Sequence, residues 1–409
     1  MSGADISDAD ITIADASGAD VPSTDVPGVD VLGRAAAVAD WLHPRAALSP
    51  ASATLPADTV DLLESEGMFR LGLPRGLGGR EADPLTLVRT AETLAYADGS
   101  AAWATMTGNS SMFFAWLDQT VAKDLLGDRP GRPVASSFAP TGRGVEEAGG
   151  YRLSGRWSFV SGSPHASLLV VGFMVAGPDG APRFAGDRPL MRWAVLPATD
   201  VRIVPTWNDA AGLRASGSHD VVAEDVHVPD ERTLLPLAEA PTADGALYRM
   251  PFYTGVRSLL VGIPLGVARR ALDEVTQLIR VKTRETQPLV RDQDTQIRLA
   301  EAEAALRAAR HYLLETTEHT WETVRSGAPV ALPLRAEYTL AAQFAMRSAV
   351  DAVNLAFGVA GASASLAGDV IQRCWRDANV ASQHIAFSRG RWRAAGQALL
   401  GADLDPDTV

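Results

Sequence analysis

The spacing of hydrophobic and polar positions changes twice along the chain. Up to about residue 126 apolar residues recur at helical spacing, and this spacing returns after about residue 247 and continues to the end. From about residue 133 to 236 apolar and polar residues instead alternate, which is typical of half-buried strands. The pattern therefore predicts a helical segment, then a β segment, then a second helical segment.

Turn residues divide these segments into individual elements. Runs separated by glycine- or proline-containing links predict strands at 151–161, 168–175, 192–196, 201–205 and 220–228. Four long helical runs are expected at 256–281, 292–325, 335–357 and 370–400. Strands without intervening helices favour a small barrel or sandwich, and four long antiparallel helices favour a bundle.

The first 33 residues differ from the rest in composition. They contain seven Asp and no Lys or Arg, so they supply seven of the 12 net negative charges of the chain. A secretory signal would need a basic start and an apolar middle, and this segment has neither. We expect a disordered acidic tail at 1–33, an N-terminal helical domain at 34–132, a middle β domain at 133–240 and a C-terminal helical bundle at 241–409.

Composition narrows the possible functions. The chain has 409 residues, enough for two or three domains, and its net charge of −12 argues against a nucleic-acid surface. No apolar run approaches the roughly 18 residues of a membrane helix, so no membrane span is expected. Cys374 is the only cysteine, which excludes an internal disulfide and a cysteine-based zinc site and favours the reducing cytoplasm. We expect no metal.

One glycine-containing stretch combines a strand with a tight turn. Residues 155–165 read Gly-Arg-Trp-Ser-Phe-Val-Ser-Gly-Ser-Pro-His, in which Trp157, Phe159 and Ser161 continue the period of two. Such a strand can bring an aromatic ring, a serine and backbone N–H groups close to a flat ligand. The alternative is an ordinary hairpin with a tryptophan in the core.

Seven short motifs follow one another along the chain. They are Leu-Pro-Arg-Gly-Leu-Gly-Gly at 73–79, Ala-Asp-Gly-Ser-Ala-Ala-Trp at 97–103, Gly-Arg-Trp-Ser-Phe-Val-Ser-Gly at 155–162, Gly-Leu-Arg-Ala-Ser-Gly-Ser-His-Asp at 212–220, Val-His-Val-Pro at 226–229, Gly-Ile-Pro-Leu-Gly at 262–266 and Arg-Asp-Ala at 376–378. In this order they resemble the acyl-CoA dehydrogenase superfamily, from about Ala35 onward. The resemblance implies an α+β fold: an N-terminal helical domain, a middle β-barrel or sandwich domain and a C-terminal four-helix bundle. It also implies a homotetramer that binds a flavin between the β domain and the bundle, with a neighbouring subunit completing the site.

The two positions at which acyl-CoA dehydrogenases carry their catalytic base are apolar in this chain. In the commonest branch a glutamate follows the Arg-Asp-Ala motif by seven positions, and Ile385 stands there. In another branch the glutamate lies six residues before the first glycine of the Gly-x-Pro-Leu-Gly motif, and Val256 stands there. Neither side chain can remove a proton next to a thioester, so ordinary acyl-CoA dehydrogenation is not expected.

A late Trp-Arg-Asp at 375–377 is followed by His384. This combination is similar to the two-component flavin-dependent monooxygenases of the same fold. That branch takes reduced flavin (FMNH2 or FADH2) from a separate flavin reductase and forms a flavin hydroperoxide with O2. It oxygenates a small organic substrate that is aromatic or polyketide-like, or a nitrogen or sulfur centre. The alternatives are an acyl-CoA dehydrogenase-like FAD oxidoreductase with a relocated base, and a catalytically silent flavin-binding or scaffold protein.

The resemblance implies roles for residues around the flavin ring. Ser161 would face the ring and His384 the substrate, where an imidazole can accept or donate a proton near neutral pH. Without the resemblance, Ser161 is a turn serine and His384 is a core histidine on a bundle helix. Trp157 and Phe159 either flank the ring or belong to the core. Further flavin contacts are expected from Ser137 and Gly162.

Other residues are expected to meet the substrate or a neighbouring subunit's flavin. Asn109 and Ser110 stand where aromatic hydroxylases of this group often carry a second histidine, which argues against phenol hydroxylation. We expect Asn109 and Trp103 to bind the substrate. Lys282 falls at the position of the arginine that reaches the neighbour's flavin phosphate, and lysine can meet a phosphate as a point charge. Further cofactor contacts are expected from Arg280 or Arg284 and from the loop glycines Gly358 and Gly361.

Overall fold

The N-terminal part of the protein is helical. The computed structural model describes residues 31–46, 53–284, 286–405 and 408–409. Its first helices are α1 (Val31–Leu42), α2 (Ala57–Ser65), α3 (Pro84–Ala97), α4 (Gly99–Thr107) and α5 (Gln119–Leu126), with a short 3₁₀ helix, η3, at Ser110–Trp116. Because α1 begins at Val31, residues 31–33 belong to a helix and not to the expected tail. Residues 1–30 of that tail lie outside the described residues.

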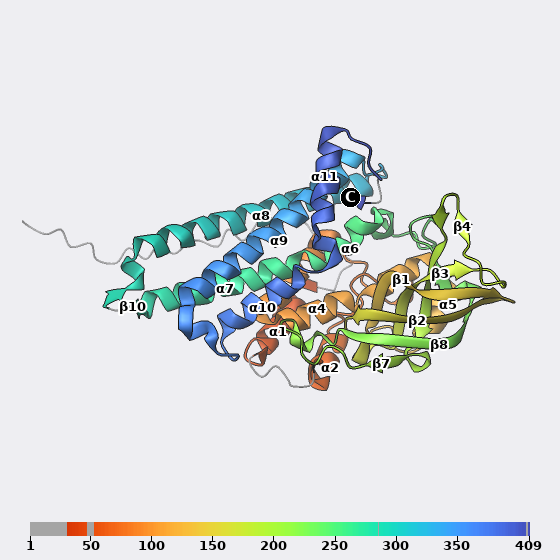
Figure 1. Ribbon diagram of the computed structural model, residues 1–409, viewed down its shortest axis with the longest axis horizontal. Coiled ribbons are helices and arrows are strands. Elements are labelled where there is room, and N and C mark those ends of the chain that lie inside the picture. The colour runs from red at the N-terminus through yellow and green to blue at the C-terminus, as the bar shows by residue number, and fades with distance from the viewer. Residues whose placement is uncertain (1–30, 47–52, 285, 406–407) are drawn as a thin grey trace, which may run out of the picture.

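Two aspartates set the ends of α3 and α4. Asp83 Oδ1 accepts a hydrogen bond from the N–H of Thr86 at 2.9 Å, and Pro84 occupies the first turn, where its missing N–H costs nothing. Asp98 ends α3 and caps α4, because its Oδ1 accepts from the N–H groups of Ser100 and Ala101 at 2.8 and 3.0 Å. The chain turns at Asp98, and α4 lies between the bundle and the sheet (Figure 1).

The middle of the chain forms a seven-stranded sheet. Its order is β7 (Arg202–Val204), β8 (His219–Pro229), β2 (Gly150–Val160), β1 (Val134–Glu147), β3 (Leu168–Ala176), β6 (Met191–Pro197) and β9 (Thr233–Leu234). The pair β1 and β3 is parallel, and the other neighbours are antiparallel. Two short strands, β4 (Phe184–Ala185) and β5 (Arg188–Pro189), form a separate hairpin. The sequence predicted five of the seven sheet strands and missed β1 and β9.

Trp157 lies at the centre of the sheet's own core. Its side chain is completely buried, and its indole N–H donates to the carbonyl of Gly172 at 2.7 Å. Glycines make room for the ring: a Cβ at Gly142 would lie 2.4 Å from Trp157 Cζ2, and one at Gly155 would lie 2.8 Å from Cη2. Truncating such a ring to alanine costs roughly 3–5 kcal/mol. Trp157 is therefore a core residue.

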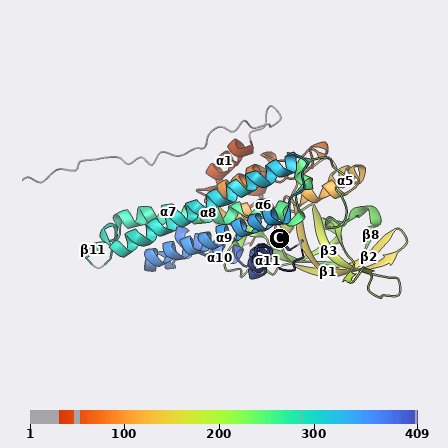
Figure 2. The ribbon, with the colours of Figure 1, turned by 90° about the horizontal axis from the view of Figure 1, so that it is seen from above.

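The C-terminal part is a helical bundle. Its helices are α6 (Phe252–Leu260), α7 (Gly262–Val281), α8 (Gln293–Arg325), α9 (Leu332–Ala360), α10 (Val370–Ala381) and α11 (Arg389–Leu400). The long helices among them are α7, α8 and α9. A two-stranded turn, β10 (Thr283–Arg284) with β11 (Gln287–Pro288), joins α7 to α8 at the end of the bundle farthest from the sheet (Figures 1 and 2). No helix among the described residues combines the length and apolar character that a membrane crossing requires.

The prediction of one helix over 370–400 is wrong. The helix α10 ends at Ala381, and a short 3₁₀ helix, η11 (Ile385–Phe387), precedes α11. The carbonyl of Ala386 in this break accepts a hydrogen bond from Gln343 Nε2 at 2.7 Å, so α9 stabilises the interruption. His384 therefore lies in a loop at the start of η11 and not on a bundle helix.

The motif Gly-Ile-Pro-Leu-Gly brings α7 into backbone contact with α3. A Cβ at Gly262 would lie 2.1 Å from the carbonyl oxygen of Val88, and one at Gly266 would lie 2.1 Å from that of Glu92. Any larger residue would force the two helices apart. The motif thus joins the N-terminal helices to the bundle.

Candidate active site

Three predicted site residues from three different elements meet beside the sheet. The indole N–H of Trp103, on α4, donates to Ser161 Oγ at 3.0 Å. On its other side the Trp103 ring meets the ring of His384 edge-on, with 5.4 Å between centroids and an interplanar angle of 75°. Ser161, Trp103 and His384 therefore form one continuous line, which we call the Ser–Trp–His line.

A chain of buried hydroxyls extends from this line into the sheet. Ser161 Oγ lies 2.8 Å from Ser218 Oγ, which lies 2.7 Å from Ser216 Oγ. All three serines are buried. The sequence prediction named only Ser161, although the other two stand at alternate positions of the motif at 212–220. That alternation is the signal that could have identified them.

Local backbone geometry places Ser161 at the end of β2. Gly162 follows it with a φ of +73°, in the left-handed region that glycine adopts without a steric cost, and its N–H donates to the carbonyl of Ser216 at 2.8 Å. The loop that carries Ser216 is fixed in turn to α10, because the N–H of Leu213 donates to Asp377 Oδ1 at 2.6 Å. The motifs at 155–162, 212–220 and 376–378 thus support one another.

The hydrogen bonding of His384 defines which nitrogen can act. The N–H of Ala386 donates to His384 Nδ1 at 3.2 Å, so the neutral ring carries its proton on Nε2. Burial lowers the pKa of His384 to about 4, and the ring is therefore neutral at pH 7. In this arrangement His384 presents an N–H donor, and its only acceptor nitrogen is already used.

Phe159 and Trp157 have opposite environments, although they are two residues apart. Trp157 lies in the sheet core, whereas the side chain of Phe159 is 70% exposed. Phe159 also has a φ of +60°, a conformation that costs a residue with a side chain roughly 1 kcal/mol or more. Its ring meets Trp207 edge-on at 6.1 Å between centroids. Strained backbone that presents an exposed aromatic ring is a feature of ligand sites.

Ser137 and Asn109 differ in how free their side chains are. Ser137 is partly buried on β1, where the register with β3 shifts. Asn109 is completely buried, and its amide is saturated by backbone groups. Its oxygen accepts from the N–H groups of Leu71 and Gly72, and its nitrogen donates to the carbonyls of Met68 and Thr105. The Asn109 amide therefore fastens a loop and has no atom left for the expected contact with a substrate.

The predicted phosphate-binding residues gather at the far end of the bundle. Lys282 is the C-cap residue that follows α7, and its ammonium donates to the carbonyl of Ala360 and to Ser363 Oγ, the latter at 2.9 Å. Gly361, with a φ of +56°, and the exposed Gly358 belong to the same corner. Exposed Arg280 donates to Gln277 Oε1 at 3.4 Å. Figure 1 shows this corner, next to β10, at the opposite end of the molecule from the sheet.

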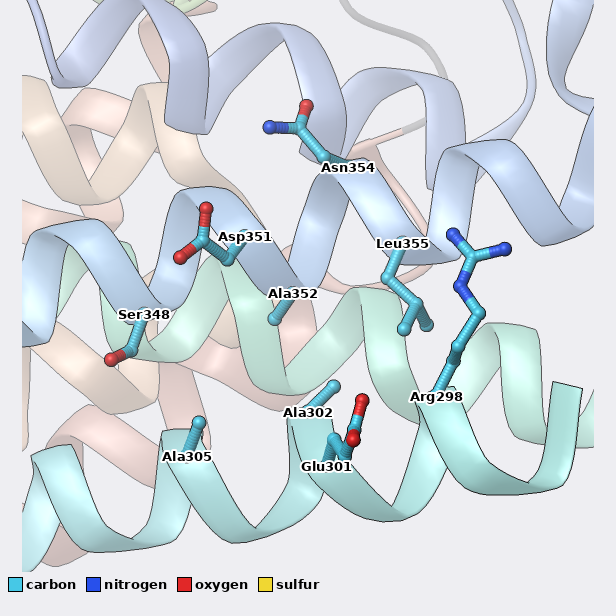
Figure 3. Close-up of a pocket in the computed structure, with 9 residues that line it drawn as sticks. All are labelled: Arg298, Glu301, Ala302, Ala305, Ser348, Asp351, Ala352, Asn354 and Leu355. Atoms are coloured by element: carbon cyan, nitrogen blue, oxygen red, sulfur yellow. The ribbon is translucent and has the colours of Figure 1, made fainter. Parts of the chain in front are cut away.

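A groove between α8 and α9 was not anticipated from the sequence. It has a volume of about 410 Å³, and small side chains of both helices, including Ala302, Ala305 and Ala352, form its floor (Figure 3). Arg298 and Asp351 stand at its edges (Figure 3). None of its lining residues belongs to the Ser–Trp–His line.

No described carboxylate replaces the missing catalytic base. Asp98 caps α4, which carries Trp103, and Asp377 lies on α10, shortly before His384. Both carboxylates accept hydrogen bonds from backbone N–H groups. Ile385, at one family base position, is largely exposed, and Val256 at the other is partly buried. Within the described parts of the chain, no three His, Cys, Asp or Glu side chains come together as a metal ion would require.

Comparison with known proteins identifies the family. Residues 259–389 match the family model described as acyl-CoA dehydrogenase, C-terminal domain. Indole-3-acetate monooxygenase of Pseudomonas putida is 32% identical over 346 residues, which cover 84% of this chain and 87% of that protein. The oxygenase subunit of a flavin-dependent monooxygenase from Rhodococcus jostii (strain RHA1) is 31% identical, over 81% of this chain and 88% of that protein.

A solved structure extends this relationship to the fold. The crystal structure of 3-HSA hydroxylase from Rhodococcus sp. RHA1 has a TM-score of 0.84 at 28% identity, covering 93% of this chain and 99% of that chain. The predicted α+β fold and the predicted superfamily are thereby confirmed. The chain belongs to the flavin-dependent monooxygenase branch of the acyl-CoA dehydrogenase superfamily.

Proposed function

We propose that this protein is the oxygenase component of a two-component flavin-dependent monooxygenase that acts on a small aromatic or heteroaromatic compound. Its cofactor is reduced flavin, FMNH2 or FADH2, and its second substrate is O2. The Ser–Trp–His line carries the proposal, because it holds a hydroxyl and an imidazole N–H on the two sides of one buried indole. Relatives named as an indole-3-acetate monooxygenase and as an oxygenase subunit support the reaction class.

The surface at the end of β2 suits a flavin ring. A flavin is flat and carries polar atoms along its edge, so it needs an aromatic or apolar face with hydrogen-bonding groups beside it. Phe159 offers an exposed ring, and Ser161 offers a hydroxyl two residues later. We assign these two residues, with Ser137 and Gly162, to the ring. When bound in its reduced form, the flavin activates O2.

Ser161 has a hydrogen available for the cofactor. Its oxygen accepts from Trp103, so its own hydroxyl hydrogen can point either to Ser218 or to a ligand. Ser216 and Ser218 keep this hydroxyl in a fixed position, and a fixed donor in a dry site is more effective than one in water. Trp103 closes the space between Ser161 and His384, which limits the access of water.

His384 acts as a hydrogen-bond donor toward the substrate. Its Nδ1 is occupied by the N–H of Ala386, which leaves the Nε2 proton for a substrate oxygen or for the oxygen that is transferred. Its pKa of about 4 keeps the ring neutral over the physiological range. A fixed neutral donor of this kind orients a polar substrate and stabilises negative charge that develops beside it.

The far corner of the bundle completes the site of another subunit in a homotetramer. Lys282 presents a positive charge beside the loop with Gly358 and Gly361, and Arg280 adds a second, exposed charge. A flavin phosphate held by these groups must belong to a neighbouring chain, because this corner, beside β10, lies at the opposite end of the molecule from β2, the strand that Ser161 directly follows (Figure 1). The groove between α8 and α9 in Figure 3, lined by small side chains, offers a surface on which helices of that neighbour can pack.

A separate flavin reductase supplies the reduced cofactor. The Rhodococcus jostii relative is named as an oxygenase subunit, which supports a second component that carries out the reduction. We place the protein in the cytoplasm, where reduced nicotinamides feed such reductases and where the buried thiol of Cys374 stays reduced. Nucleic acid and membrane are not among its proposed partners.

Incorporation of oxygen from O2 into a product, with flavin that has been reduced in advance, tests this function directly. The purified protein is mixed with photoreduced FMN or FAD, O2 and a panel of indoles, phenols and aryl sulfides, and products are identified by mass spectrometry with 18O2. We expect one 18O atom in the product and no need for the reductase once reduced flavin is supplied. Tightly bound oxidised FAD that is bleached by an acyl-CoA would contradict the proposal and support the dehydrogenase alternative.

A further inference from the structure

Arg257, on α6, is a buried cation without a counter-charge. Its side chain is 1% exposed and is among the largest fully buried side chains of the protein. One terminal nitrogen, Nη1, donates to Thr339 Oγ1 on α9, and the other, Nη2, is buried without a hydrogen-bond partner. No carboxylate among the described residues forms an ion pair with Arg257.

The other deeply buried arginine of the bundle shows the usual arrangement. The guanidinium of Arg270 lies 2.8 Å from Glu274 Oε1 and donates to His43 as well. Burial and the nearby charge of Arg391 lower the pKa of Arg257 to about 10, so it still carries its charge at neutral pH. A buried charge without a partner is strongly unfavourable, and such groups persist where a ligand supplies the opposite charge.

The surroundings of Arg257 are polar and positively charged. Tyr338 OH lies 3.0 Å from Ser258 Oγ, next to Arg257 in the chain. One helical turn earlier, on the same side of α6, Thr254 Oγ1 is buried and also has no partner. Arg391 adds a second cation, with its guanidinium 4.7 Å from the centre of the Tyr253 ring. Hydroxyls and guanidinium groups together are the donors that recognise a carboxylate.

The helix that carries Arg257 lies next to the proposed active site. In its first turn Phe252 stacks on Trp193 at 5.0 Å and meets Phe138, which follows the proposed flavin contact Ser137. On the other side, Thr339 holds Arg257, and Gln343, one turn later on α9, holds the loop that contains His384. Arg257 is therefore connected to both the flavin side and the His384 side of the site.

We propose that Arg257 is the specificity-determining residue of this site, and that it binds the carboxylate of an aromatic acid substrate. The inference rests on the proposed function and narrows its substrate class from aromatic compounds in general to aromatic acids. The free nitrogen Nη2 and the hydroxyl of Thr254 are the donors available to the carboxylate, and the aromatic part of the substrate extends toward Trp103 and His384.

Binding of matched acid and amide probes tests this inference. Indole-3-acetate is compared with indole-3-acetamide, and phenylacetate with phenylacetamide, by calorimetric titration of the full-length protein. The titrations are anaerobic, with and without reduced FMN or FAD. A hydrogen bond to a charged group is worth roughly 1.5–3 kcal/mol, so the acid of at least one pair should bind about 10- to 100-fold more tightly than its amide. In Arg257→Met this ratio should fall to about 1, with the amide affinity unchanged, and Arg257→Lys should keep part of the preference.

Controls separate this inference from the proposed function. Arg89→Met removes an exposed arginine from α3 and should keep the parent ratio. Arg257→Met should melt no lower than the parent, because it removes an unneutralised buried charge. Each of three results would overturn the inference. They are an unchanged ratio of acid to amide affinity in Arg257→Met, a parent protein that binds neither acid, and a melting temperature of Arg257→Met several degrees below that of the parent. If reduced flavin binds but the ratio of acid to amide affinity is unchanged in Arg257→Met, only the role of Arg257 is overturned. If reduced flavin does not bind at all, the proposed function is overturned.

Discussion

The backbone N–H of Leu213 donates to the buried carboxylate of Asp377 at 2.6 Å, and this contact joins the sheet to the bundle. Leu213 has a φ of +50°, so the loop adopts a strained conformation at the contact. On one side the loop leads to Ser216 and then to Ser218, whose hydroxyl lies 2.8 Å from that of Ser161. On the other side α10 leads to His384. One hydrogen bond therefore relates the two halves of the Ser–Trp–His line.

Replacing Asp377 with Asn should remove a pH dependence of stability. Burial raises the pKa of Asp377 from 3.8 to about 6, so between these values the folded chain holds a proton that the unfolded chain releases. The free energy of unfolding of the parent should therefore fall by up to about 3 kcal/mol as pH rises from about 4 to above 6. Asp377→Asn keeps an acceptor for Leu213 and should lack this fall, as measured by urea denaturation across the pH range. Asp187→Asn, at an exposed position, should follow the parent, and parallel curves for parent and Asp377→Asn would rule the prediction out.

Replacing Ser161 with Ala should uncouple oxygen consumption from product formation. The variant loses the hydroxyl that we assign to the flavin, and one such donor is worth about 10²-fold in rate. We expect most of the O2 consumed to appear as hydrogen peroxide, measured with a peroxide electrode beside product analysis. The matched control is Ser154→Ala, at an exposed position of the same strand. Parent-like coupling in Ser161→Ala would remove this residue from the flavin site.

Replacing His384 with Ala should slow oxygen transfer without weakening flavin binding. The loss of a positioned donor or acid is worth roughly 10²–10⁴-fold. Because its pKa is about 4, His384 should also give the parent no change of rate between pH 6 and 8. Single-turnover product formation at several pH values measures both effects, with the exposed His311→Ala as the control. A step in the parent profile near pH 6.5 that disappears in His384→Ala would contradict the neutral-donor role.

Replacing Phe159 with Gly should stabilise the protein and weaken flavin binding. Glycine adopts a φ of +60° without the steric cost that Phe159 bears, so the free energy of unfolding should rise by about 1 kcal/mol. The lost ring contact should weaken reduced-flavin binding about tenfold, in line with aromatic contacts worth roughly 0.5–1.5 kcal/mol. Thermal denaturation and anaerobic titration measure the two effects. Phe184→Ala, which removes another exposed aromatic ring, should leave flavin affinity unchanged.

Hydrophobic spacing predicted most of the fold but not the central strand β1. That strand contains Gly142 and Gly144, and a Cβ at either glycine would lie within 2.5 Å of the ring of Trp157 or Phe173. The apolar side chains that cover β1 thus come from its neighbours, so its own sequence lacks the alternation. The break before His384 was missed for a similar reason, because it contains no Gly or Pro and is held by Gln343 of α9.

The candidate site was predictable only where a motif defined the side-chain type. Ser161, Trp103 and His384 were named separately, and the structure brings them together. The sequence could not separate Trp157 from Phe159, because the period of two continues through both while the backbone bulges between them and turns Phe159 outward. Nor could it show that the amide of Asn109 is saturated by backbone groups. Arg257 was missed because an arginine on an amphipathic helix ordinarily lies at the surface.

The contact of Gly262 and Gly266 with the backbone of α3 limits how this chain can be recombined with its relatives. A Cβ at either glycine would also lie within 3.0 Å of the methyl group of Ala91 or Ala95. A chimera that takes the first half from another family member must therefore supply small residues at both alanine positions, or its α3 will not seat on α7. The helices α3 and α7 can therefore be exchanged only as a matched pair. The sheet that lies between them in the sequence can be replaced without altering the packing of α3 on α7.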